Sequence, residues 1–117
     1  MDITVSIVED DERVRASLAA LIQSSEMCSC AGVSGTAEEA LLVLPAQRPD
    51  VVLMDINLPR MSGVECVRKL KAQFPQMQFL MLTVYDDSDS LFDSLRAGAS
   101  GYLLKRTATK HLIEAIQ

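Results

Sequence analysis

The sequence predicts an α/β domain in which a five-stranded parallel sheet is covered by helices on both faces. Short apolar runs alternate with longer segments of helical period along the chain, as in doubly wound α/β domains. With 117 residues, 49% of them apolar, the chain has enough material for one packed core and too little for two. It has no internal repeat and no Pro/Gly/Ser-rich linker, so we expect a single domain over residues 1–117.

The predicted elements alternate along the chain. The apolar runs predict strands at residues 3–8, 28–33, 51–54, 78–82 and 101–104. Helical period predicts helices at residues 12–24, 37–44, 63–73 and 90–97, and a last one from about residue 110 to the end. One helix between successive strands is the arrangement that right-handed crossovers between parallel strands require.

Local signals mark several helix ends. Thr36 with Glu39, and Ser62 with Glu65, have the spacing of capping boxes, in which the side chains satisfy the first free amides. Gly98 follows the fourth predicted helix, where a left-handed residue commonly ends a helix. All four prolines are expected in loops: Pro45, Pro49, Pro59 and Pro75.

The charge balance excludes one class of partner. The net charge of −5 argues against a nucleic-acid surface, because neutralising phosphates needs clustered Lys and Arg. Any DNA contact is therefore expected in a domain outside this chain. Residues 111–117 still have the pattern of an amphipathic helix where the sequence stops, with no capping signal, so we expect a piece of a longer protein.

The sequence shows no secretion signal and no apolar run of the roughly 20 residues that cross a bilayer, so we expect a soluble cytoplasmic protein without membrane contact. Cys28, Cys30 and Cys66 are expected to be reduced thiols that pack in the interior. A zinc site is the alternative, but zinc needs four ligands, and the only histidine, His111, is distant in the sequence.

Charged and hydroxyl side chains follow four of the five predicted strands. Residues 9–11 (Glu-Asp-Asp) follow the first strand, Asp55 the third, Thr83 the fourth and Lys105 the fifth. The carboxyl ends of parallel strands meet at one edge of the sheet, where such sheets bind ligands. We therefore expect these side chains to converge.

The carboxylates of this set predict a divalent-cation site. Converging carboxylates raise one another's pKa unless a cation is present, and Mg²⁺, or Mn²⁺ in its place, prefers hard oxygen ligands. Asp10 and Asp55 are the expected ligands, with Glu9 acting through water. Asp11 is expected only to stabilise the N-terminus of the following helix, and for Asp10 taken alone that role and the metal role are equally compatible.

A hydroxyl and a lysine beside such a cation suit a phosphoryl group. Thr83 can donate a hydrogen bond to one phosphoryl oxygen, and Lys105 can neutralise another. Asp55 is then the expected nucleophile, since a carboxylate placed in line accepts a phosphoryl group. Singly, these residues have ordinary explanations as a turn residue, a cap or a solvated lysine. Their occurrence together at the strand ends indicates a site.

In these residues essentially the whole chain resembles the receiver domains of two-component response regulators. The segments that carry the resemblance are residues 7–11, 51–59, 62–63, 80–83 and 98–105. Arg15 follows the acidic segment at the family's spacing, and we expect it to be a surface or ion-pairing residue of the first helix.

The resemblance implies the flavodoxin-like receiver fold, with strand order 2-1-3-4-5. It implies a signalling phospho-acceptor rather than an enzyme with a separate substrate, with an aspartyl phosphate formed on Asp55 from the phosphohistidine of a sensor histidine kinase. The backbone carbonyl of Asn57 would complete the magnesium shell. Thr83 and Tyr102 would form a coupled switch, although Tyr102 can also be read as an ordinary strand aromatic that is half-buried against a helix.

The sequence departs from the family pattern at one position and has a bulky residue at another. Many members have proline after the lysine, whereas this chain has Lys105-Arg106, so a cis bond there would cost roughly 3–4 kcal/mol without proline's help and its isomer stays open. Tyr85 lies two residues beyond Thr83. We hypothesise that its bulk slows self-dephosphorylation by hindering water, with Asn57 unable to act as a strong base.

The segment 98–105 looks most like NarL/FixJ-type receivers that precede a helix-turn-helix domain, which makes transcription regulation, through dimerisation or release of an effector domain, the expected output. One alternative is a phosphohydrolase of the haloacid dehalogenase type, but Asn57 stands where that family needs a second Asp, and there is no room for a cap. A nonphosphorylated interaction module is a second alternative. No phosphate loop follows the first strand, so no organic cofactor is expected.

Overall fold

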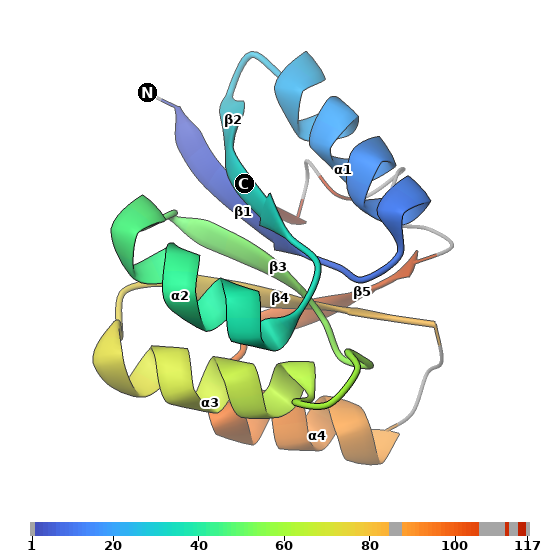
Figure 1. Cartoon of the computed structure of the whole chain (residues 1–117), viewed down its shortest axis with the longest axis vertical. Helices are drawn as coiled ribbons and strands as arrows, with labels where there is room; N and C mark the ends of the chain where they lie inside the picture. The colour runs from blue at the N-terminus through green and yellow to red at the C-terminus, as the bar shows by residue number, and fades with distance from the viewer. Residues whose placement is uncertain (1, 85–87, 106–111, 113–114, 117) are drawn as a thin grey trace.

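The computed structural model describes residues 2–84, 88–105, 112, 115 and 116. Five parallel strands form one sheet in the order β2-β1-β3-β4-β5, which confirms the predicted topology (Figure 1). The strands are β1 (Ile3–Val8), β2 (Cys28–Ser34), β3 (Val51–Asp55), β4 (Gln78–Thr83) and β5 (Gly101–Leu104). The helices are α1 (Glu12–Ser24), α2 (Ala37–Gln47), α3 (Gly63–Gln73) and α4 (Ser88–Ala97).

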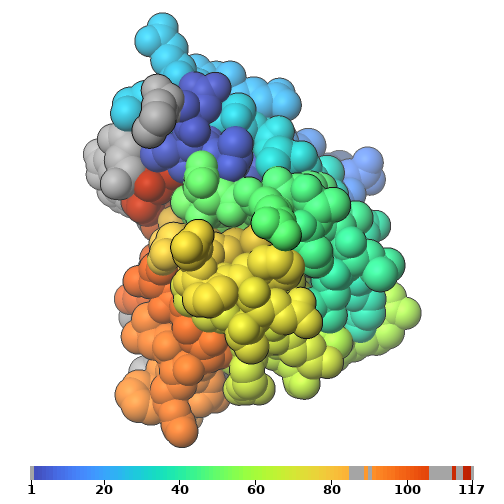
Figure 2. Space-filling model, turned by 90° about the vertical axis from the view of Figure 1, so that its left-hand side faces the viewer, coloured from blue at the N-terminus to red at the C-terminus, as the bar shows by residue number. Residues whose placement is uncertain are grey.

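The helices cover both faces of the sheet. Helices α2, α3 and α4 form one layer, seen as neighbouring green, yellow and orange surfaces in Figure 2, and α1 lies on the opposite face in Figure 1. Alternate strand residues bury into the two cores: Val52 and Phe79 on the α2–α4 side, and Leu53 and Leu82 on the α1 side. None of the described helices is long and apolar enough to cross a bilayer.

The helix ends follow the local signals in the sequence. Thr36 and Ser62 accept hydrogen bonds from the backbone amides three residues on, as the capping-box spacing predicted. Gly98 has a φ of 118°, a left-handed conformation that favours glycine. The three cysteines are free thiols. Of the predicted C-terminal helix, only residues 112, 115 and 116 are described, and Leu112 is buried in the core on the α1 side.

The expectation that Pro45 lies in a loop was wrong, because α2 continues to Gln47. A proline near the end of a helix removes only one intrahelical hydrogen bond, and the chain here supplies others. The amide of Arg48 donates to the Leu44 carbonyl at 2.8 Å, and Arg48 ends the helix in the left-handed conformation, with a φ of 46°. The other three prolines lie in loops, as expected.

The connection between β3 and α3 is tightly packed. The amide of Gly63 donates to the Ile56 carbonyl at 3.0 Å, which brings the start of α3 against the end of β3. A Cβ atom at position 63 would lie 2.0 Å from the carbonyl oxygen of Asp55, so only glycine fits without a backbone shift. This contact fixes the main chain at Asp55.

Candidate functional site

The loop after β1 carries the first two acidic residues of the site. Glu9 is fully buried, its amide donates to the Ser34 carbonyl at 3.0 Å, and its Oε2 accepts from the amide of Asp11 at 3.1 Å. Asp10, the next residue, is exposed. Asp11 is the N-cap of α1 and accepts from the amides of Arg13 and Val14, which confirms its expected structural role.

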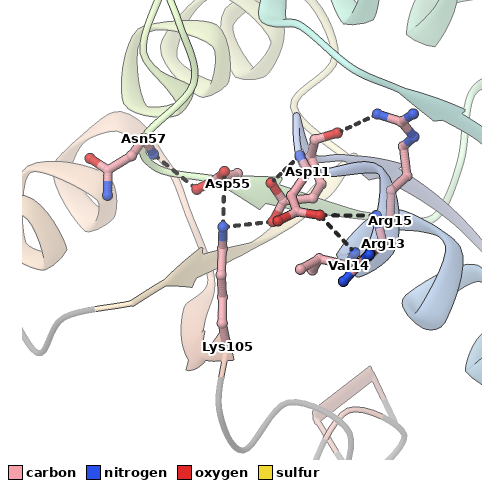
Figure 3. A network of polar contacts seen from close by, with 8 residues as sticks. Asp11, Arg13, Val14, Arg15, Asp55, Asn57 and Lys105 are labelled. Atoms are coloured by element: carbon pink, nitrogen blue, oxygen red, sulfur yellow. Dashed lines mark hydrogen bonds and ion pairs between the residues drawn. The ribbon is translucent and has the colours of Figure 1, made fainter.

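The third carboxylate lies at the end of the central strand β3. Asp55 is buried, with 1% of its surface exposed, and its Oδ1 accepts from the Asn57 amide at 3.0 Å. The side chain of Asn57 is exposed and points away from Asp55 (Figure 3). One carboxylate oxygen each from Glu9, Asp10 and Asp55 lie within 4.8 Å of one another, so the structure brings the predicted acidic residues together.

Lys105 reaches this cluster from the end of β5. Its Nζ lies 3.1 Å from Oδ2 of Asp55 and 2.7 Å from Oε1 of Glu9 (Figure 3). The sequence placed Lys105 at the same edge as Glu9, as a phosphoryl partner, but did not indicate the direct ion pair between them. Strand order brings the two residues to one edge, whereas the ion pair depends on the paths of the side chains.

The electrostatics of the cluster follow from its burial. Burial raises the pKa of Glu9 to about 7, the Asp55 carboxyl adds to the shift, and Lys105 opposes it. The hydrogen bond to Glu9 lowers the pKa of Asp10 below its ordinary value. Burial disfavours the charged form of Lys105, but its interactions with Glu9 and Asp55 outweigh that effect and raise its pKa. Near neutral pH the Glu9 carboxyl is therefore partly protonated, and the ammonium of Lys105 contacts two of the three carboxyl groups.

These residues fit a hard divalent cation. Three carboxylates of two neighbouring strands converge, and Oε1 of Glu9 is buried without a well-aligned hydrogen bond from the described residues, its contact with Lys105 being an ion pair. Oxygen donors that are held close together and are short of partners suit Mg²⁺ or Mn²⁺. Asp10 is exposed, so the cluster can be reached from solvent on the side of this residue.

Of the three remaining predicted site residues, two lie on β4 and β5. Thr83 is the last residue of β4, is 3% exposed and pairs in register with Leu104, the residue before Lys105. Tyr102 is 45% exposed, so about half of its side chain is covered, as the alternative of a half-buried strand aromatic implied. Tyr85 and Arg106 lie outside the described residues.

Arg15 plays a part that the sequence did not indicate. It lies on α1 as expected, but it is half-buried and its Nη1 donates to the backbone carbonyl of Glu9 at 2.9 Å (Figure 3). The expectation of a surface or ion-pairing residue missed this main-chain contact. A contact with a carbonyl leaves no trace in residue type or spacing.

Comparison with known proteins decides among the functions that such an edge supports. The family model of the response regulator receiver domain matches residues 5–117. The chain belongs to that family. It is a receiver domain of two-component response regulators with the predicted fold, and nothing in the comparisons supports a haloacid dehalogenase-type phosphohydrolase.

Relatives of this receiver are transcriptional regulators. The DNA-binding transcriptional activator DevR/DosR of Mycobacterium tuberculosis is 35% identical over 115 residues, which cover 98% of this chain and 53% of that protein. The transcriptional regulatory protein YxjL of Bacillus subtilis is 33% identical over 115 residues, with 98% and 53% covered. The receiver thus spans about half the length of these curated relatives.

Solved structures agree with the assignment. A two-component response regulator of the LuxR family from Aurantimonas sp. SI85-9A1 superposes with a TM-score of 0.93 at 28% identity, over 99% of this chain and 83% of that one. The response regulator domain of Thermotoga maritima CheB has a TM-score of 0.92 at 24% identity, over 99% and 94% of the two chains, and shows the shared fold.

Proposed function

We propose that this receiver accepts a phosphoryl group on Asp55 from the phosphohistidine of a sensor histidine kinase. The observation that carries the proposal is the position of the Asp55 carboxylate at the end of the central strand, held by the Asn57 amide and by Lys105. An oxygen of Asp55 would attack phosphorus while the bond from phosphorus to the donor nitrogen breaks. The cluster is thus a phospho-acceptor rather than an enzyme site with a separate substrate.

A divalent cation, Mg²⁺ or Mn²⁺, would be held by Glu9, Asp10, Asp55 and the backbone carbonyl of Asn57. The cation would neutralise charge on the phosphoryl oxygens. The buried Glu9 would bind it through water once its proton is lost, and the exposed Asp10 would keep the site open to solvent. Phosphorylation adds about −1.5 to −2 charges to an acidic pocket, so we expect no reaction without the metal.

Lys105 and Thr83 would act on the phosphoryl group itself. The ammonium that now pairs with Asp55 and Glu9 can turn to a phosphoryl oxygen, and the buried hydroxyl of Thr83 at the end of β4 can donate to another. Movement of Thr83 would open space for Tyr102 to turn inward, and its exposed position in this structure supports an outward starting state. Asn57 and Tyr85 would set the rate at which water removes the phosphoryl group.

The proposed output is control of transcription in the cytoplasm. The transcriptional regulators among the relatives are about twice as long as this chain, so we propose one receiver domain over residues 1–117, with an effector domain outside it that makes any DNA contact. Phosphorylation would act through homodimerisation or by releasing that domain. Size-exclusion chromatography of the full-length product, with and without phosphorylation, distinguishes the two.

Acetyl phosphate with Mg²⁺ tests the central claim. We expect a mass increase of one phosphoryl group that is lost in hydroxylamine and absent with EDTA or in Asp55→Asn, while the control Asp93→Asn, an exposed residue of α4, is modified like the wild type. An unmodified wild type would instead support the nonphosphorylated interaction module. Decay of the phosphorylated form in Tyr85→Ala tests the shielding role, and an unchanged rate contradicts it.

A further inference from the structure

The loop that carries Glu9 and Asp10 is anchored twice by one residue of α1. The amide of Arg15 donates to the carbonyl of Asp11 at 2.9 Å, and its Nη1 reaches back to the carbonyl of Glu9, also at 2.9 Å. Figure 3 shows the guanidinium turned toward that carbonyl and away from the carboxylates. The two contacts bracket Asp10.

The guanidinium sits between two loops. A Cβ atom on Gly35, in the loop after β2, would lie 3.1 Å from Nη1 of Arg15, so the absence of a side chain at position 35 leaves room for the arginine. The amide of Glu9 is already tied to the Ser34 carbonyl of the same neighbouring segment. Both ends of the Glu9 backbone are thus fixed, the amide by β2 and the carbonyl by α1.

This contact determines the direction of Asp10. The carbonyl of Glu9 and the amide of Asp10 belong to one planar peptide group, so a hydrogen bond that orients the carbonyl also orients the bond into Asp10. The carboxylate of Glu9 is held by burial and that of Asp11 by its role as the helix cap, whereas Asp10 is exposed and its carboxylate is held by the hydrogen bond with Glu9. Whether that carboxylate reaches the cation site therefore depends also on the direction of the main chain on either side.

We propose that Arg15 is a positioning residue that aims the Asp10 carboxylate into the cation site. The inference rests on the proposed function, since it assigns a role within the same site. A charged donor to a carbonyl is a strong, directional contact. Groups that orient ligands without touching the metal commonly contribute about 10- to 100-fold to metal affinity.

Charge alone predicts the opposite effect, which makes the inference easy to test. Arg15 is a cation near a cation site, so removing it without loss of geometry would tighten Mg²⁺ binding. If the main-chain contact dominates, removing it weakens binding. The sign of the change in the dissociation constant for Mg²⁺ therefore separates the two effects.

The experiment measures Mg²⁺ binding by calorimetry in the whole chain and in three variants. We expect about 10-fold weaker binding in Arg15→Met and an intermediate loss in Arg15→Lys, which keeps the charge without the planar fork. Arg13→Met is the matched control, since Arg13 is an exposed arginine of the same helix turn, and it should bind as the wild type or slightly more tightly. Urea unfolding in EDTA reports stability separately.

A second readout separates positioning from damage to the chemistry. In Arg15→Met, saturating Mg²⁺ should restore the rate of phosphorylation by acetyl phosphate to within about 2-fold of the wild type, because ligand aim changes affinity rather than the reacting groups. Equal or tighter Mg²⁺ binding in Arg15→Met overturns the inference. If that variant fails to fold, Arg15→Lys decides in the same way. Absence of Mg²⁺ binding in the wild type would overturn the proposed function as well.

Discussion

The edge of the sheet that holds Asp55 and the region formed by α4 and β5 are built differently. At the edge, Glu9, Asp55 and Thr83 are buried and tied to neighbouring strands. On α4 and β5, large apolar side chains stand in solvent, with Phe92 61% and Tyr102 45% exposed. The comparison indicates that the groups proposed to react are held in fixed positions, whereas the exposed side chains on the face proposed to respond, such as Phe92 and Tyr102, can move without disturbing the core.

Two phenylalanines give the widest contrast between the regions. Phe79 of β4 is fully buried, so we expect Phe79→Ala to lower the free energy of unfolding by about 4 kcal/mol through loss of buried area and the cavity left behind. Phe92→Ala on α4 should cost under about 1 kcal/mol. Urea denaturation of both variants measures the difference. Equal losses would show that α4 is as firmly packed as the core.

A pair of glycines tests the rigidity of the edge itself. Gly63→Ala places a Cβ atom 2.0 Å from the Asp55 carbonyl oxygen, and we expect a loss of about 3 kcal/mol. The control is Gly101→Ala at the start of β5, where the new atom would lie 3.5 Å from Leu80, an ordinary contact, with a change within about 1 kcal/mol. If Gly63→Ala is tolerated equally well, the β3–α3 connection can shift and the edge is less constrained than the contacts indicate.

Lys105 joins the two regions, and its removal should destabilise the metal-free protein. Lys105→Met leaves the buried carboxylates of Glu9 and Asp55 without a cation, at a cost of about 2 kcal/mol at about pH 8. At about pH 5.5 the cost should shrink, because Glu9 then carries a proton. Lys69→Met, an exposed lysine of α3, is the control and should change stability by less than about 0.5 kcal/mol. A loss that does not depend on pH contradicts this account.

The smallest predicted effect is the pH dependence of Mg²⁺ affinity. The pKa of Glu9 is raised from 4.5 to about 7, so the metal-free folded form binds a proton that the unfolded chain has lost. The resulting contribution to stability is present at low pH and disappears as the pH rises through about 7. Mg²⁺ competes with this proton, so the dissociation constant for Mg²⁺ should be about 10-fold higher at about pH 6 than at about pH 8. Calorimetry should show that Mg²⁺ affinity depends less on pH in Glu9→Gln. The same pH dependence in this variant and the wild type would show that Glu9 is not the group responsible.

The fold and most of the site could be predicted because both depend on local patterns. Strand and helix bounds followed the apolar period to within a few residues, and Asp55 and Thr83 were found because parallel strands end at one edge. The prediction for Pro45 was wrong because it relied on residue type alone, whereas α2 continues past the proline to Gln47. The contacts of Lys105 with Glu9 and of Arg15 with a carbonyl depend on side-chain paths across the folded chain, which no local pattern records.

Because of the strand order, the contacts of Lys105 connect distant parts of the sheet. β5 is an edge strand of the sheet, yet the ammonium of Lys105, the residue after it, contacts the carboxylates of Glu9, just after β1, and of Asp55, at the end of β3. The Lys105 side chain thus links the edge strand β5 to the central strands of the sheet. A change of charge at Asp55, as in the proposed phosphorylation, would change the attraction on Lys105, and Tyr102 of β5 lies three positions before it.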